Sequence, residues 1–106
     1  MTEAQISRQI VDFLRMVGWA VYDTGQGYRK EPGGTRITAG LADLVCIGHG
    51  RALFVEVKSQ GGRLRDSQRE FAGHCADNGV ACVCWRSVGE AWDWHIEQGL
   101  LEEAAS

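Results

Sequence analysis

The sequence has a single proline, no long apolar run and no excess of basic residues among its 106 residues. A membrane-spanning helix needs about 20 consecutive apolar residues, and no stretch of this chain approaches that length. Hydrophobic residues make up 44% of the chain, which is typical of a folded globular protein rather than a disordered one. The first residues, Met-Thr-Glu-Ala-Gln, lack the basic and apolar pattern of a secretion signal. We therefore expect a single domain over residues 1–106, located in the cytoplasm, with residues 99–106 as a loose tail.

The sequence also lacks the cysteine spacing that favours a zinc site. The four cysteines are Cys46, Cys75, Cys82 and Cys84. Only one residue separates Cys82 from Cys84, and no second closely spaced pair accompanies them. We expect buried, reduced thiols, and we expect neither an organic cofactor nor a membrane partner.

Hydrophobic periodicity and capping residues divide the chain into seven expected elements. Thr2 with Gln5 fits a capping box that opens a first helix, and Gly18 ends it. There follow strands over residues 19–24, 41–47 and 52–57, a helix over 66–78, a strand over 80–85, and a last helix from a second capping box, Ser87 with Glu90, to near Gly99. The helix between the last two strands makes them parallel. The expected fold class is α/β: a mixed four-stranded sheet flanked by helices, in the order α-β-β-β-α-β-α.

The segment Gly48-His49-Gly50-Arg51 is typical of a hairpin turn between the second and third strands. A two-residue loop at His49 and Gly50 pairs residues whose numbers sum to 99, so Asp43 faces Glu56. Directly opposed side chains lie on one face about 5 Å apart, and Lys58 shares that face two residues later. A three-residue loop would instead place Asp43 and Glu56 on opposite faces.

Two carboxylates and an ammonium group at one end of a hairpin indicate metal-assisted phosphodiester hydrolysis. Adjacent carboxylates repel each other unless a positive charge lies between them, and Mg²⁺ prefers carboxylate and water oxygens. The Val57 backbone carbonyl can add a ligand, and Lys58 can orient a water or stabilise developing charge. The alternative is a structural ion pair between Lys58 and either acid.

Read together, these residues resemble the PD-(D/E)xK nuclease superfamily, and most of all its small virus-type replication-repair nuclease (VRR-NUC) domain. The resemblance covers nearly the whole chain and implies a restriction-endonuclease-like core. Ala42 stands where the superfamily usually has proline, a position that shapes the backbone and binds no metal. The matching segments are Gly40-Leu41-Ala42-Asp43-Leu44-Val45, Phe54-Val55-Glu56-Val57-Lys58, and Gly61-Gly62-Arg63-Leu64 with Gln68.

The resemblance implies a Mg²⁺- or Mn²⁺-dependent, structure-selective endonuclease that cuts branched or junction DNA in replication, repair or recombination and leaves a 5′-phosphate. It implies Asp43 and Glu56 as metal ligands, Lys58 as the catalytic lysine and Gln68 as an active-site helix residue. It also implies a homodimer, in a bacterial cell or a phage-infected host. In related nucleases, an acid at the position that Glu3 occupies here can complete the metal site. The alternatives are a surface role for Gln68 and a favourable helix-dipole interaction for Glu3.

Basic residues gather around the expected site, although the net charge of the chain is −3. Residues 28–69 contain eight basic and four acidic residues, whereas the rest contains three basic and ten acidic ones. We expect this positive region to bind the phosphates of DNA. The candidate nucleic-acid-binding residues are Tyr28, Arg29, Lys30, Arg36, Arg63 and Arg65.

Two other functions remain open at this point. A non-catalytic DNA-binding or nuclease-accessory module would keep the same fold, but it would have no need of an intact Asp43, Glu56 and Lys58. A sequence-specific restriction-type nuclease would need base-reading elements, for which this short chain has little room.

Overall fold

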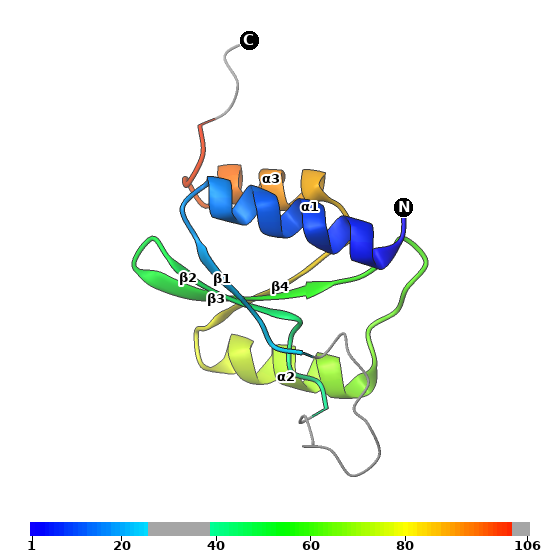
Figure 1. Ribbon diagram of the computed structural model, residues 1–106. Helices are drawn as coiled ribbons and strands as arrows, with labels where there is room; N and C mark the ends of the chain where they lie inside the picture. The colour runs from blue at the N-terminus through cyan, green and yellow to red at the C-terminus, as the bar shows by residue number, and fades with distance from the viewer. Residues whose placement is uncertain (26–38, 103–106) are drawn as a thin grey trace.

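Helices and strands follow one another in the expected order in the computed structural model, which describes residues 1–25 and 39–102 (Figure 1). The boundaries agree with those expected to within a few residues. The elements are α1 (Glu3–Met16), β1 (Ala20–Asp23), β2 (Leu44–Gly48), β3 (Arg51–Val57), α2 (Asp66–Asp77), β4 (Ala81–Trp85) and α3 (Val88–Glu97).

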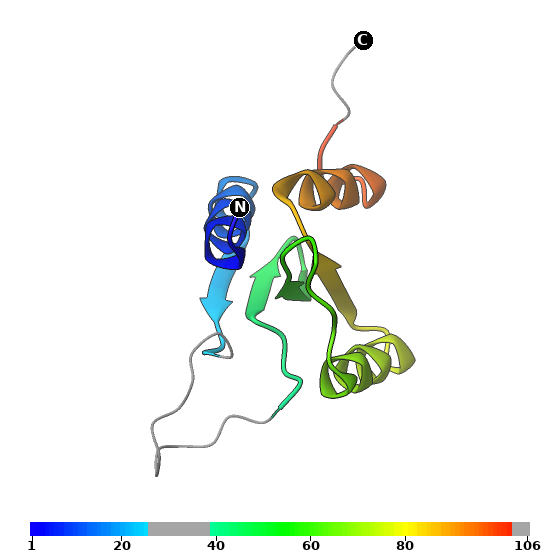
Figure 2. The same cartoon turned by 90° about the vertical axis from the view of Figure 1, so that its right-hand side faces the viewer.

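The four strands form one mixed sheet in the order β1-β2-β3-β4. Strands β1 and β2, and then β2 and β3, pair antiparallel, whereas β3 and β4 pair parallel across the α2 crossover. Figures 1 and 2 show α1 and α3 on one face of the sheet and α2 on the other. The expected fold class is therefore confirmed.

The hairpin between β2 and β3 has the predicted two-residue turn. Ile47 pairs with Ala52 and Gly48 with Arg51, and both turn residues have positive φ, 52° at His49 and 73° at Gly50. Positive φ at both positions defines the type I′ turn, whose twist matches that of the flanking strands. The turn therefore sets the register on which the predicted meeting of Asp43 and Glu56 depends.

The expected start of the second strand at Leu41 is wrong, because the ladder ends at the pair Leu44–Val55. The Val57 N–H donates to the Asp43 side chain, at 2.9 Å from Oδ2, instead of extending the ladder. The backbone carbonyl of Asp43 accepts a hydrogen bond from Thr24 N at 2.9 Å. Asp43 thus lies just beyond the strand, with its side chain tied to β3.

Both predicted helix starts are observed, with one difference. Thr2 and Gln5 form the full reciprocal capping box. At α3, Ser87 Oγ accepts from Glu90 N at 3.2 Å, but the Glu90 carboxylate accepts from Arg86 N rather than from Ser87 N. The second predicted capping box is therefore only half formed, because the Glu90 side chain accepts from the residue before the N-cap instead of from the N-cap itself.

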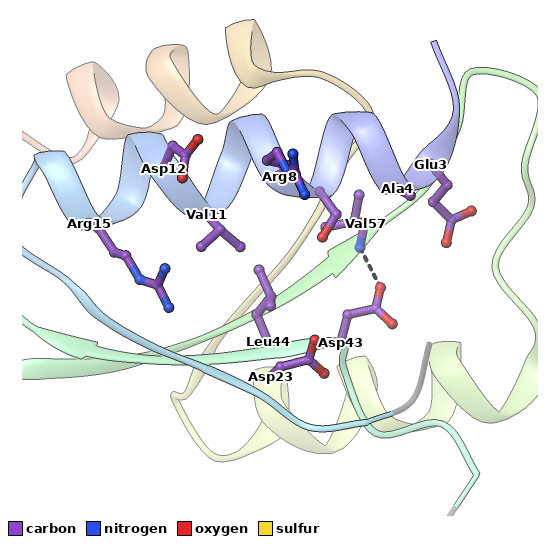
Figure 3. Close-up of a pocket in the computed structure, with 11 residues that line it drawn as sticks. Glu3, Ala4, Arg8, Val11, Asp12, Arg15, Asp23, Asp43, Leu44 and Val57 are labelled. Atoms are coloured by element: carbon purple, nitrogen blue, oxygen red, sulfur yellow. Dashed lines mark hydrogen bonds between the residues drawn. The ribbon is translucent and has the colours of Figure 1, made fainter. Parts of the chain in front are cut away.

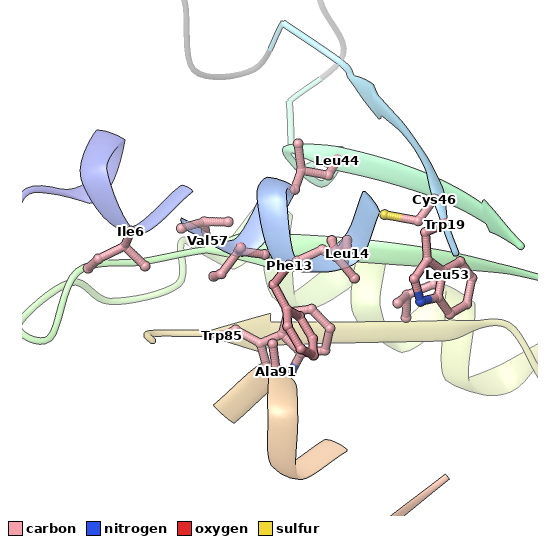
Figure 4. Close-up of a cluster of buried hydrophobic side chains, with 12 residues drawn as sticks. Ile6, Phe13, Leu14, Trp19, Leu44, Cys46, Leu53, Val57, Trp85 and Ala91 are labelled. Atoms are coloured by element: carbon pink, nitrogen blue, oxygen red, sulfur yellow. The ribbon is translucent and has the colours of Figure 1, made fainter. Parts of the chain in front are cut away.

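The core lies between α1, α3 and the face of the sheet that they cover (Figure 4). Apolar side chains of α1 pack at helical spacing against alternate residues of β2, β3 and β4. The segment expected as a loose tail begins later than predicted, because Leu100 and Leu101 pack against this core. Backbone hydrogen bonds to the carbonyl of His95 hold both residues there.

The thiols are free, as expected, but two of them are only half-buried. Cys46 and Cys75 are buried, and Cys82 and Cys84 are intermediate. Burial raises the pKa of Cys46 and of Cys82 to about 12, so these thiols stay protonated near neutral pH. Within the described residues, no helix has the length and apolar content to cross a membrane.

Candidate active site

The carboxylates of Asp43 and Glu56 meet where β2 and β3 end beside α2. Glu56 is 5% exposed on the sheet face that α2 covers. Gln68, in the first turn of α2, is 6% exposed, and its Nε2 donates to Glu56 Oε1 at 2.8 Å. The Gln68 Oε1 in turn accepts from Arg65 N at 2.8 Å. Both ends of the Gln68 amide are therefore fixed, and the donor end is directed at Glu56.

Asp43 is positioned by backbone contacts on both sides. Its Oδ2 accepts from Val57 N, and Thr24 Oγ1 donates to the carbonyl of Ala42 at 2.6 Å. Gly40 has φ +93°, and a Cβ there would collide with the backbone carbonyl of Ser67 in α2. Only glycine fits this close approach, so the chain enters the site through a glycine-dependent contact with α2.

The surroundings of Glu56 disfavour its charged form. Burial, together with the neighbouring Asp43 carboxylate, raises the pKa of Glu56 to about 8, and Glu3 adds to the rise. Lys58 opposes it, although the ion pairs among the described residues, Arg69–Asp66 and His74–Glu70, do not include Lys58. The structural ion pair considered for Lys58 is therefore not observed, and Lys58 acts on Glu56 at longer range.

Comparison with known proteins gives a likeness in structure and none in sequence. No protein-family model and no curated protein matches the chain. A solved structure described as a VRR_NUC domain superposes with a TM-score of 0.69 at 20% identity. The match covers 92% of this chain and 97% of that one. The chain has the fold of a VRR-NUC domain. At this identity the likeness establishes the architecture alone, and the roles of individual residues rest on their geometry.

The donor set in this VRR-NUC fold suits a hard divalent cation. A buried Glu56 carboxylate beside the Asp43 carboxylate gains from a positive charge between them. Within residues 1–25 and 39–102, however, no group of three or more His, Cys, Asp or Glu side chains surrounds a common ion position. Asp43 and Glu56 would therefore need oxygens from the Val57 carbonyl and water to complete a shell, as Mg²⁺ sites commonly do.

Glu3 stands apart from the Asp43–Glu56 pair but lines the same cleft as Asp43. This cleft, which we call the α1 cleft, has a volume of about 610 Å³ between α1 and the ends of β1, β2 and β3 (Figure 3). Its lining residues are Glu3, Ala4, Ser7, Arg8, Val11, Asp12, Arg15, Asp23, Asp43, Leu44 and Val57. Glu3 thus lies within reach of the site, at the start of the helix that forms one wall.

The predicted nucleic-acid-binding residues fall into two groups. Arg63 and Arg65 are exposed in the segment that leads into α2, beside Gln68. Tyr28, Arg29, Lys30 and Arg36 lie outside the described residues.

Three basic residues near the candidate site, Arg8, Arg15 and Arg86, were not predicted from the sequence. Arg8 and Arg15 line the α1 cleft. The Arg86 Nη1 donates to the carbonyl of Ser59, at 2.7 Å, and to that of Gly62, in the loop that follows Lys58. The seven-residue spacing of Arg8 and Arg15, which places two side chains on one helix face, was the available signal. No local sequence pattern signals the contacts of Arg86.

Proposed function

We propose that this chain is a Mg²⁺- or Mn²⁺-dependent DNA endonuclease that selects DNA structure rather than sequence. The observation that carries the proposal is the buried Glu56 carboxylate, held by Gln68 beside Asp43, with its pKa raised to about 8. Such a charge arrangement is unfavourable in an empty site and favourable around a divalent cation. The VRR-NUC fold supports this reading.

In this proposal Asp43, Glu56 and the Val57 carbonyl hold the cation, with Glu3 as a further oxygen donor. The bound cation supplies charge stabilisation at the scissile phosphate and a lowered pKa for the attacking water. Lys58 holds that water in line with the phosphorus and stabilises the charge that develops. Gln68 keeps the Glu56 carboxylate in one orientation, because its Nε2 donates to Oε1, and Oε2 is the oxygen that would bind the cation. The leaving 3′-oxygen takes up a proton, and a 5′-phosphate remains.

The finer parts of the proposal concern substrate and assembly. We infer that branched or junction DNA is cut during replication, repair or recombination in the cytoplasm of a bacterial cell or phage-infected host. Arg63 and Arg65, with Tyr28, Arg29, Lys30 and Arg36, are the proposed DNA contacts outside the α1 cleft. One chain of this size offers one active site, so symmetrical cutting of a junction needs a homodimer.

The test is a cleavage assay on single-stranded, duplex, flap, splayed-arm and four-way-junction DNA with Mg²⁺, Mn²⁺ or EDTA. Asp43→Asn and Lys58→Ala are compared with Asp93→Asn, an exposed acid of α3 far along the chain from the site. We expect metal-dependent cutting that Asp43→Asn and Lys58→Ala abolish and Asp93→Asn leaves intact. A folded wild type that binds DNA but cuts no substrate would overturn the enzyme and favour the accessory module.

A further inference from the structure

The α1 cleft has two distinct ends. Figure 3 shows Glu3 and Asp43 toward the start of α1, and Arg15 at the opposite end of the helix. Asp43 belongs to the proposed catalytic centre, so one end of the cleft opens onto that centre. The rest of the cleft extends along α1 away from that centre, and the proposed chemistry does not require it.

Arg8 and Arg15 form a basic track on the helical wall of this cleft. They are seven residues apart, which places them on one face of α1 about 10 Å from each other along the axis. Both are exposed, and the ion pairs found among residues 1–25 and 39–102 include neither. Two guanidinium groups with no acidic partner in that part of the chain are well suited to phosphate oxygens.

The volume of the α1 cleft limits what can lie inside it. Its walls are a helix and the edge of the sheet on which that helix packs, and its volume is about 610 Å³. A space of this size matches a small ligand, such as two or three nucleotides of one strand. A duplex of that length adds a complementary strand, so it exceeds this volume and does not lie wholly inside the cleft.

We propose that the α1 cleft holds an unpaired nucleic-acid strand, with Arg8 and Arg15 binding phosphates on one side of the phosphate to be cut. This inference rests on the proposed nuclease function and deepens it by naming the form of the substrate strand that enters the site. Glu3, Asp12, Asp23 and Asp43 also line the cleft, so the strand binds better when a divalent cation offsets their charge. Binding is therefore strengthened by divalent cations, beyond any effect of ionic strength.

The test measures binding of a labelled single-stranded DNA 12-mer, its duplex and the RNA of the same sequence by fluorescence anisotropy in Ca²⁺ across a range of salt. The variants are Arg8→Gln, Arg15→Gln and the double substitution. Arg51→Gln is the matched control, because Arg51 is an exposed arginine beside the hairpin turn. We expect each cleft substitution to weaken single-strand binding about three- to tenfold and to lower the salt slope by about 0.7. Duplex binding and the control stay unchanged.

The outcomes separate this inference from the proposed function. If wild type cuts DNA while Arg8→Gln and Arg15→Gln bind single strands as Arg51→Gln does, the inference is overturned and the nuclease stands. Equal losses of affinity for the single strand and the duplex would overturn the proposal that the bound strand is unpaired. If wild type neither binds nor cuts any substrate, the proposed function falls and the inference with it. Equal losses with DNA and RNA support recognition of the backbone, whereas losses with DNA alone support a site that excludes the 2′-hydroxyl.

Discussion

At the scale of single residues, buried polar side chains in this protein are fixed by partners that differ in kind. Glu56 is held by Gln68, and burial together with the neighbouring Asp43 carboxylate raises its pKa to about 8. His95 is fully buried and uses both ring nitrogens. Its Nδ1 donates to the carbonyl of Ala91 at 2.7 Å, and its Nε2 accepts from Trp19 Nε1 at 2.8 Å. The surroundings of Glu56 suit the binding of a cation, whereas those of His95 suit stability.

The His95 contacts require the neutral ring, so we expect stability to depend on its protonation. Burial lowers the pKa of His95, and His49 adds to the effect. His95 is protonated more readily in the unfolded chain than in the folded one. Its contribution to the free energy of unfolding is therefore present above pH 6.5 and is lost as pH falls below it. His95→Phe should lower the free energy of unfolding at pH 7.5 by about 1–3 kcal/mol, because Trp19 Nε1 loses its acceptor.

Urea unfolding followed by circular dichroism from pH 7.5 to 5.5 measures this. The gap between wild type and His95→Phe should narrow toward pH 5.5, by up to about 1.4 kcal/mol per pH unit. Other titrating groups are common to both proteins and cancel in the difference. A gap independent of pH would show that His95 is not held neutral.

At the scale of elements, turn chemistry and hydrophobic period predicted the architecture well. The type I′ turn at His49 and Gly50 determined the hairpin register, which brings Asp43 and Glu56 to the same end of the sheet. Contacts between distant segments were not predictable, because they depend on tertiary geometry. The Asp43–Val57 hydrogen bond and the anchoring of the Ser59–Gly62 loop by Arg86 carry no local pattern.

The contact between Gly40 and α2 gives a prediction at this scale. Gly40→Ala places a Cβ against the carbonyl of Ser67 at positive φ, and we expect a loss of roughly 2–4 kcal/mol in the free energy of unfolding. Gly79→Ala is the matched control, because Gly79 also has positive φ but nothing within 4 Å of an added Cβ. It should cost only about 1–2 kcal/mol. Equal losses would mean that α2 does not approach Gly40 closely.

Arg86 links the Lys58 segment to the rest of the sheet. We expect Arg86→Ala to lower kcat roughly 10- to 100-fold with little change in KM, because the loop that follows Lys58 loses its anchor and Lys58 its position. Arg86→Lys, which keeps a cationic donor, should recover part of the loss. The assay is steady-state cleavage well below the melting temperature of each variant. Matching losses in kcat for Arg86→Ala and Arg86→Lys, or a change confined to KM, would argue against a positioning role.

At the scale of the whole molecule, the proposed catalytic centre lies where two layers meet. Asp43 lines the α1 cleft on one face of the sheet, whereas Glu56 and Gln68 line a smaller pocket of about 160 Å³ beneath α2 on the other. The centre therefore joins the two helical layers through the ends of β2 and β3. The sequence led us to expect Asp43 and Glu56 on one face of the hairpin. The two openings were not predictable, since they depend on how α1 and α2 pack against the sheet.

A cation that joins these two layers should stabilise the whole fold by mass action. A ligand at ten times its Kd that binds only the folded state adds about 1.4 kcal/mol, which raises the melting temperature of a domain this small by about 5–10 °C. We expect this rise with Mg²⁺ or Mn²⁺, its reversal by EDTA, and no comparable rise with K⁺ at equal ionic strength.

Asp43→Asn keeps an oxygen that accepts from Val57 N but removes the charge beside Glu56. This variant should therefore melt at or above wild type without metal and show almost no rise with it. Asp93→Asn should respond as wild type does. A similar rise in Asp43→Asn would place the bound cation somewhere other than between Asp43 and Glu56.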